Sequence, residues 1–119
     1  MGPSSFQKVS DFFSNLAGLA DARQELLRYD QIIQFHILGE GPFLIRVSQG
    51  KVSSELGEVK NHDFLKVLTV KTDAATITKL LERRWTLGEG LFQGKVDIHG
   101  NTVKGYIIAW LSKLLRTTG

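Results

Sequence analysis

The side chains that most often perform catalysis or bind metals are few in this sequence and widely spaced. The three histidines, His36, His62 and His99, fall in separate segments and show no spacing typical of metal ligands. There is no cysteine, which excludes thiolate chemistry, zinc–thiolate sites and disulfide bonds. Neither a nucleophile motif nor a phosphate-binding glycine loop is present. We therefore expect neither an enzyme nor a metal or cofactor site.

One segment places a neutral hydrogen-bonding side chain beside apolar residues, a combination that suits ligand binding. It covers residues 91–101, and Phe92 and Gln93 lie near its start. The amide of Gln93 offers both a donor and an acceptor to the polar end of an otherwise apolar ligand. The second half of the segment alternates apolar and polar residues. This pattern predicts a half-buried strand with Val96 and Ile98 facing the core.

The residues that follow predict an amphipathic helix over 102–116. Its apolar side chains recur at spacings of three and four, and they cover more than one narrow stripe. Such a helix can pack on a sheet with one part of its surface and face a ligand with another. The candidate ligand contacts are Ile107, Trp110, Leu111 and Leu114. Simple closure of the core is the alternative role of these side chains.

Together these features resemble the C-terminal signature of the sterol carrier protein 2 (SCP2-like) family of lipid-binding domains. Members typically show aromatic residues, then glutamine, glycine and lysine, a short strand and a Gly-Asn or Gly-Asp turn. The stretch FQGKVDIHGN follows that order, and Leu91 stands where a first aromatic residue is usual. In the family this aromatic and glutamine segment borders a lipid tunnel. The resemblance therefore implies lipid contact by Phe92 and Gln93, with Leu91 beside them.

The sequence departs from the family pattern shortly before this signature. Members often have glycine where Arg83 stands, proline where Leu87 stands and alanine where Gly90 stands. These differences predict a differently shaped approach to the signature strand. They leave the preferred lipid open.

The middle of the chain predicts strands, because apolar and polar residues alternate there. Four strands are expected before the signature strand, over residues 32–38, 43–47, 51–56 and 64–70. Glycine-rich turns at 39–42 and at Gln49-Gly50 separate the first three. Every connection is short, which favours an antiparallel meander in which each strand pairs with the next.

Helical spacing is found before and after these strands. The N-terminal stretch predicts a helix capped by Ser4 or Ser5, interrupted at Gly18 and resumed over 22–29. A further helix, capped by Thr72 or Asp73, should end at the turn-forming residues 86–90. This order indicates an α+β fold of two layers, a five-stranded, mainly antiparallel sheet covered on one face by helices. The resemblance implies the same architecture.

Length and charge narrow the range of functions. A chain of 119 residues can bury a substantial core, and we expect residues 1–119 to form one domain. The net charge of +3 arises from 15 basic and 12 acidic residues without a block of like charge, so nucleic acid is not an expected partner. Neither a membrane-spanning run nor a signal segment is apparent in the sequence. We expect a cytoplasmic protein.

We interpret the chain as a non-catalytic carrier that holds an apolar ligand in a tunnel between sheet and helices. The expected ligand is a fatty acid, phospholipid, sterol or isoprenoid. Transient contact with an anionic membrane and pairing into a homodimer are both compatible with the sequence. The alternative is an interaction or scaffold module for enzymes of lipid or isoprenoid-quinone metabolism, with the apolar groove contacting a partner protein.

Overall fold

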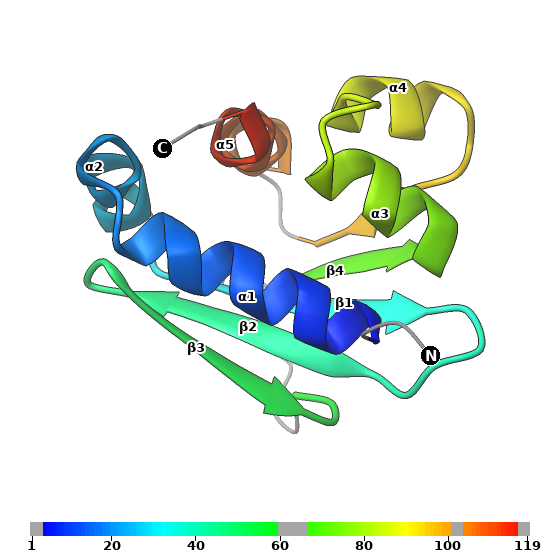
Figure 1. Cartoon of the computed structure of the whole chain (residues 1–119), viewed down its shortest axis with the longest axis horizontal. Helices are drawn as coiled ribbons and strands as arrows, with labels where there is room; N and C mark the ends of the chain where they lie inside the picture. Colours follow the sequence, from blue (N-terminus) through cyan, green and yellow to red (C-terminus); the bar gives the residue numbers. More distant parts are fainter. Residues whose placement is uncertain (1–3, 60–66, 101–103, 117–119) are drawn as a thin grey trace.

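Five strands and a set of helices on one of their faces form the two layers of the computed structural model, which describes residues 4–59, 67–100 and 104–116 (Figure 1). The sheet has the strand order β3-β2-β1-β4-β5. The strands are β1 (Gln31–Ile37), β2 (Phe43–Ser48), β3 (Lys51–Leu56), β4 (Val67–Thr72) and β5 (Asp97–His99). Three of the four pairings are antiparallel, so the predicted α+β architecture with a mainly antiparallel sheet is confirmed.

The first three strands form the predicted antiparallel meander. β1 pairs with β2, and β2 pairs with β3 through a loop that consists of Gln49 and Gly50 alone. Both loop residues have positive φ, 53° and 79°, as a type I′ turn requires. Phe35 and Phe43 lie opposite each other on β1 and β2, and their stacked rings have centroids 4.9 Å apart. Local alternation and turn chemistry therefore suffice to build this half of the sheet.

The fourth strand shows that the prediction of a meander throughout was wrong. β4 runs parallel to β1, with Ile32 opposite Val67, instead of pairing with β3. The shortness of the connection was misleading because the chain between β3 and β4, residues 57–66, spans up to about 33 Å when extended. The end of β3 is level with Phe35 and the start of β4 is level with Ile32, so the chain must move three strand spacings sideways and about three residues back along the strands, roughly 17 Å in all. A crossing without a helix is therefore long enough.

Two of the predicted helix starts are confirmed in atomic detail. The hydroxyl of Ser4 accepts a hydrogen bond from the Gln7 backbone N–H, and the carboxylate of Asp73 accepts one from Thr76 at 2.7 Å. The predicted interruption near Gly18 separates the first two helices. The helices are α1 (Ser5–Ala17), α2 (Ala20–Arg28), α3 (Ala74–Leu81), α4 (Leu87–Phe92) and α5 (Lys104–Arg116).

α4 corrects the prediction that residues 86–90 form only a turn. The hydroxyl of Thr86 accepts a hydrogen bond from Glu89 N–H at 3.1 Å, and the helix runs on from this cap. Gly90 lies inside the helix, where an added Cβ would stand 2.8 Å from Cγ2 of Val96. The glycine thus permits close packing of α4 against the segment before β5. Phe92 is therefore the last residue of α4.

Candidate ligand cavity

An apolar cavity of about 50 Å³ lies between the sheet and the helices. Its lining combines residues of α1, α3, α4 and α5 with residues of β1 and β4, and every lining side chain is aliphatic or aromatic. The lining residues are Val9, Phe13, Phe35, Val70, Ile77, Leu80, Leu81, Leu87, Leu111 and Leu115. Such a surface offers no hydrogen bond, so the cavity suits only the hydrocarbon part of a ligand.

The floor of the cavity depends on the parallel strand pair. Phe35 of β1 and Val70 of β4 are register partners, so the crossing that places β4 beside β1 also brings these two side chains together. The helical walls follow from spacing. Val9 and Phe13 are four residues apart on α1, as are Leu111 and Leu115 on α5, so each pair lies on one helix face. Local sequence patterns thus provide the walls, and the topology provides the floor.

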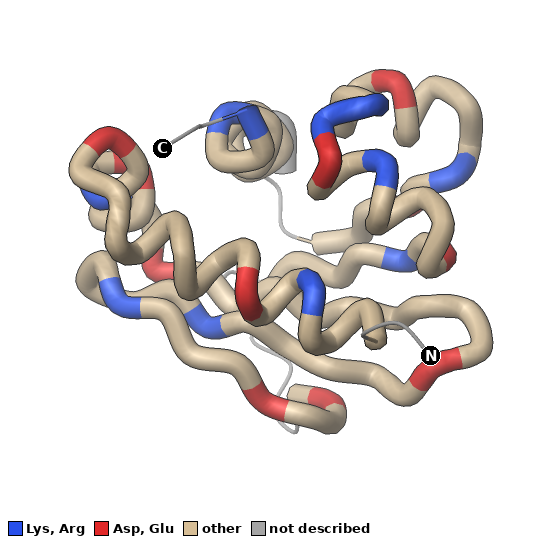
Figure 2. Tube along the Cα trace, viewed as in Figure 1, with Lys and Arg blue, Asp and Glu red and all other residues tan. Residues whose placement is uncertain are grey.

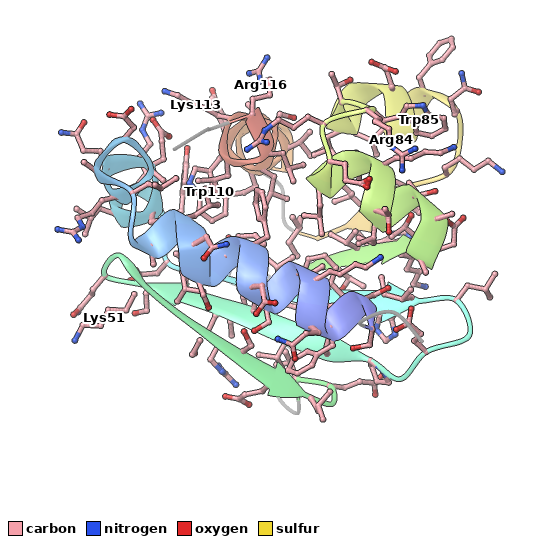
Figure 3. All side chains as sticks on the ribbon, viewed as in Figure 1. Lys51, Arg84, Trp85, Trp110, Lys113 and Arg116 are labelled. Atoms are coloured by element: carbon pink, nitrogen blue, oxygen red, sulfur yellow. The ribbon has the colours of Figure 1, made fainter. Side chains whose placement is uncertain are left out.

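The predicted contacts of the C-terminal helix are buried, but only Leu111 lines this cavity. Ile107 and Leu114, 2% and 0% exposed, are part of the hydrophobic core. Trp110 points inward from α5 and its indole N–H donates to the Glu25 carbonyl oxygen at 2.7 Å, which joins α5 to α2 (Figure 3). The helix therefore both closes the core and contributes to the cavity wall.

The predicted contacts of the signature segment lie away from the cavity in this structure. Phe92 is 90% exposed at the end of α4, and Gln93 is exposed and caps that helix through its backbone N–H. Leu91 is half-buried against the core, outside the cavity lining. The residues that sequence reasoning missed, such as Val9 and Phe13, carried the signal of helical spacing. They could not be separated from ordinary core residues without the arrangement of the helices.

The size of the cavity determines what binding requires. Ligand pockets of proteins usually measure about 300–1,000 Å³, so a lipid chain can enter only if lining side chains move. A void of 50 Å³ corresponds to about 1 kcal/mol of lost packing, which a hydrocarbon guest would restore. Leu81 and Leu115 are only half-buried and lie at the margin of the cavity. They are the lining residues with the most freedom to move.

No charged residue lines the cavity, and acidic and basic residues are interspersed along the chain (Figure 2). The hydrogen bond from the Thr76 backbone N–H lowers the pKa of the Asp73 carboxyl, and Lys95 and Lys79 act in the same direction. This carboxylate caps α3 and does not face the cavity. Within the described ranges, no group of acidic and histidine residues could hold a metal ion, and no helix is suited to crossing a membrane.

A helix-covered sheet with an apolar cavity between its layers defines a class of small α+β ligand-binding domains. Within this class, the chain belongs to the SCP-2 sterol transfer family, whose sequence model matches residues 13–106. The family resemblance drawn from the signature segment is thereby confirmed, and lipid binding is the general property of the family. A comparison with curated protein sequences finds no significant match.

Several solved structures share the fold. A ubiquinone synthesis protein, UbiJ-SCP2, has a TM-score of 0.71 at 14% identity, covering 92% of this chain and 91% of that one. Palmitated SCP2L2 from Aedes aegypti has a TM-score of 0.69 at 16% identity, covering 98% and 96%. The sec-alkylsulfatase Pisa1 from Pseudomonas sp. has a TM-score of 0.65 at 19% identity. It aligns with 93% of this chain, which spans only 17% of the sulfatase's length.

Proposed function

We propose that this protein binds a lipid by its hydrocarbon chain and carries it without acting on it chemically. The observation that carries the proposal is the cavity between sheet and helices, whose lining is wholly apolar. Membership of the SCP-2 sterol transfer family supports lipid binding in general. A relative of the same fold was solved in a palmitated form, which supports an acyl chain as one occupant. Phospholipids, sterols and isoprenoids are further candidate ligands, because they too are largely apolar.

The energetics of transfer suit a carrier. Burial of about twelve methylenes, at roughly 0.8 kcal/mol each, amounts to roughly 10 kcal/mol relative to water. A donor membrane already provides most of that free energy to a lipid chain. Transfer from membrane to protein is therefore close to balanced and reversible. This balance favours a protein that takes up and releases lipid over one that holds it permanently.

The proposal includes transient contact with anionic membranes in the cytoplasm. Lys113 and Arg116 project from the outer side of α5, and Arg84 lies at the turn between α3 and α4 (Figure 3). Each such cation contributes at most about 1 kcal/mol near an anionic surface. Lys113 and Arg84 also form ion pairs with Glu25 and Glu82, which reduces their share. Phe92, 90% exposed at the end of α4, is better placed for contact with a membrane or a partner than for lining the cavity. A cytoplasmic location accords with the absence of cysteine.

Blocking the cavity tests the proposal directly. Val70→Phe places a ring on the cavity floor, and we expect it to weaken binding of a fluorescent fatty acyl probe at least about tenfold while circular dichroism stays native. Val52→Phe is the matched control, because Val52 is a half-buried strand valine outside the cavity lining. Native mass spectrometry of the purified protein should also detect bound lipid. Failure of the wild-type protein to bind any long-chain amphiphile would contradict the proposal.

A scaffold role in isoprenoid-quinone synthesis is the second candidate. It is favoured by the similarity in fold to UbiJ-SCP2, described as a ubiquinone synthesis protein, over nearly the full length of both chains. In this role Phe92 would contact a partner enzyme, or a second copy of the chain would pair with it. Size-exclusion chromatography with light scattering, for wild type and for Phe92→Ser, separates the candidates. A lipid-free protein whose self-association or enzyme binding is lost in Phe92→Ser supports the scaffold.

A further inference from the structure

A surface hollow of about 290 Å³ lies between α1 and α3, next to the cavity. From α1 it is lined by Lys8, Asp11, Phe12 and Asn15, which repeat at spacings of three and four and so form one stripe of the helix. The end of α3 contributes Thr78, Leu81 and Glu82 with the same spacing. Two facing helix stripes therefore make one mixed polar and apolar depression.

Leu81 connects this hollow with the interior, since its side chain lines both the hollow and the cavity. It is half-buried, so a change of its side-chain rotamer would join the two spaces. Lys8 Nζ donates a hydrogen bond of 2.9 Å to Thr78 Oγ1 and thereby bridges α1 and α3 at the same place. A ligand that moves from the hollow into the cavity must displace Leu81 and break the hydrogen bond between Lys8 and Thr78.

The charges of the hollow favour a particular kind of head group. Lys8 provides one ammonium group, and the carboxylates of Asp11 and Glu82 outnumber it. Gln7 donates to Asp11, and Arg84 pairs with Glu82 at 3.2 Å, so the hollow and its rim hold two positive and two negative charges and give a purely anionic head no net attraction. A zwitterionic head can place its phosphate at Lys8 and its quaternary ammonium near the carboxylates. The half-buried ring of Phe12 suits the same ammonium group.

We infer that the hollow between α1 and α3 seats the zwitterionic head group of a single-chain phospholipid whose acyl chain passes Leu81 into the cavity. This inference rests on the proposed lipid-binding function and adds the position and chemistry of the head group. A single chain is specified because the unexpanded cavity of about 50 Å³ demands less side-chain displacement for one chain than for two. The phosphate would replace Thr78 as the hydrogen-bond acceptor of Lys8.

A pair of lysophospholipids with the same acyl chain tests the head-group site. Lysophosphatidylcholine carries no net charge, whereas lysophosphatidylglycerol carries one negative charge. We expect the choline lipid to bind about fivefold more tightly at low salt, measured by displacement of a fluorescent acyl probe. The double variant Asp11→Asn, Glu82→Gln should remove this preference, and Lys8→Met should weaken the choline lipid. Equal or tighter binding of the glycerol lipid by the wild type would overturn the inference.

Site-specific blocking tests the route past Leu81. The chain contains no cysteine, so Asn15→Cys and Ser14→Cys can each be labelled uniquely with a polyethylene glycol maleimide. Position 15 lines the hollow, whereas the adjacent exposed position 14 does not. Labelling Asn15→Cys should slow lysolipid uptake in stopped-flow measurements by at least about tenfold, and labelling Ser14→Cys should not. Equal effects of the two labels would contradict the route.

Measuring palmitate binding distinguishes a failure of this inference from a failure of the proposed function. If the wild type binds palmitate and Val70→Phe does not, the lipid-binding function stands whatever the lysolipids show. If the wild type binds neither palmitate nor a lysolipid, the proposed function itself is wrong. The head-group inference alone fails if palmitate binds but the lysolipid preference or the labelling effect is missing.

Discussion

Gln49 and Arg83 are the two non-glycine residues of the described chain with positive φ, 53° and 60°. This left-handed conformation is unfavourable for most residues with a Cβ. At Arg83 the SCP2 family often has glycine, which adopts the conformation freely. Leu87 occupies the first position of α4, where the proline common in the family is also well tolerated. Arg83 thus holds a conformation that glycine adopts without strain, and Leu87 adds an apolar side chain to the cavity lining.

Gln49→Asn should stabilise the protein. Asparagine tolerates the left-handed region better than glutamine, and Asn-Gly is the preferred pair in a type I′ turn. We expect the free energy of unfolding, measured with urea, to rise by about 0.5–1 kcal/mol. The hydrogen bond from the position 49 backbone N–H to Asp30 is unaffected by this change. In contrast, Gln49→Val should lower stability, and a gain in that variant would refute the explanation.

For single residues, turns and burial were easier to predict from the sequence than contact with the cavity. The turn at Gln49-Gly50 and the burial of Val96 and Ile98 follow from local pattern, and the structure contains all of them. Phe92 could not be placed from pattern, because the exposure of a helical residue depends on which side of the helix packs. Leu111 and Leu114 look alike in the sequence, yet only Leu111 lines the cavity. That difference arises from the neighbouring helices.

Among the elements, α3 has the greatest influence on the cavity, since it contributes three lining residues and one side of the adjacent hollow. Asp73 fixes its start by accepting the Thr76 N–H, and the helix ends at Leu81. A change at this cap would therefore alter the position of Ile77, Leu80 and Leu81 relative to the sheet.

Asp73 should make the stability of the protein pH-dependent. Its hydrogen bond from Thr76 lowers the folded-state pKa below 3.8, so the stabilisation is complete above the unfolded-state pKa and is lost as the pH falls through the folded-state pKa. Asp73→Asn retains a capping side chain without a titrating group, so its unfolding free energy should decline less between pH 5 and pH 3. Asp73→Ala should cost about 1 kcal/mol at pH 7. Parallel acid dependence in wild type and Asp73→Asn would exclude this role.

Helix starts were predictable because an N-cap is a hydrogen bond between residues three positions apart in the sequence. The existence of α4 was not, because glycine at positions 88 and 90 normally ends a helix and the sequence gives no sign of what packs against it. Tertiary contact explains the exception, since Gly90 lies against Val96.

In the whole molecule, the crossing from β3 to β4 determines how the two halves of the sheet meet. Gln34 of β1, a residue only 4% exposed, anchors the start of this crossing. Its amide nitrogen donates to the carbonyl oxygens of Phe43 and Gly57, at 2.9 and 3.0 Å, and its oxygen accepts from Val59 N–H at 2.8 Å. All three bonds join backbone groups that would otherwise need other partners.

Gln34→Ala should destabilise the fold strongly. The substitution leaves buried backbone groups without their side-chain partner, and we expect a loss of about 2–4 kcal/mol in unfolding free energy. Gln24→Ala, at an exposed position of α2, serves as the control and should change stability by less than about 0.5 kcal/mol. Urea denaturation at pH 7 measures both. A loss below about 1 kcal/mol in Gln34→Ala would show that the anchor is dispensable.

The layer architecture was predictable from the order of helical and strand patterns, but the parallel pairing of β1 and β4 was not. Alternation fixes which face of a strand is buried, and it carries no information on which strand lies beside it. In the sequence Gln34 looks like an exposed polar residue between Ile33 and Phe35, and only the structure shows that it is buried and bonds the crossing. The cavity floor could not be predicted for the same reason, since it requires Phe35 and Val70 to be neighbours.

β1 is bonded along both edges, to β2 through a nearby hairpin and to β4 through contacts distant in sequence. During folding the hairpin closes a short loop, whereas docking of β4 must close a much longer one at greater entropic cost. The three-stranded meander is therefore the natural nucleus, and β4 and β5 join it later. By the same reasoning, partial unfolding begins at the β4 edge of β1, and amide hydrogens shared by β1 and β2 exchange with solvent last.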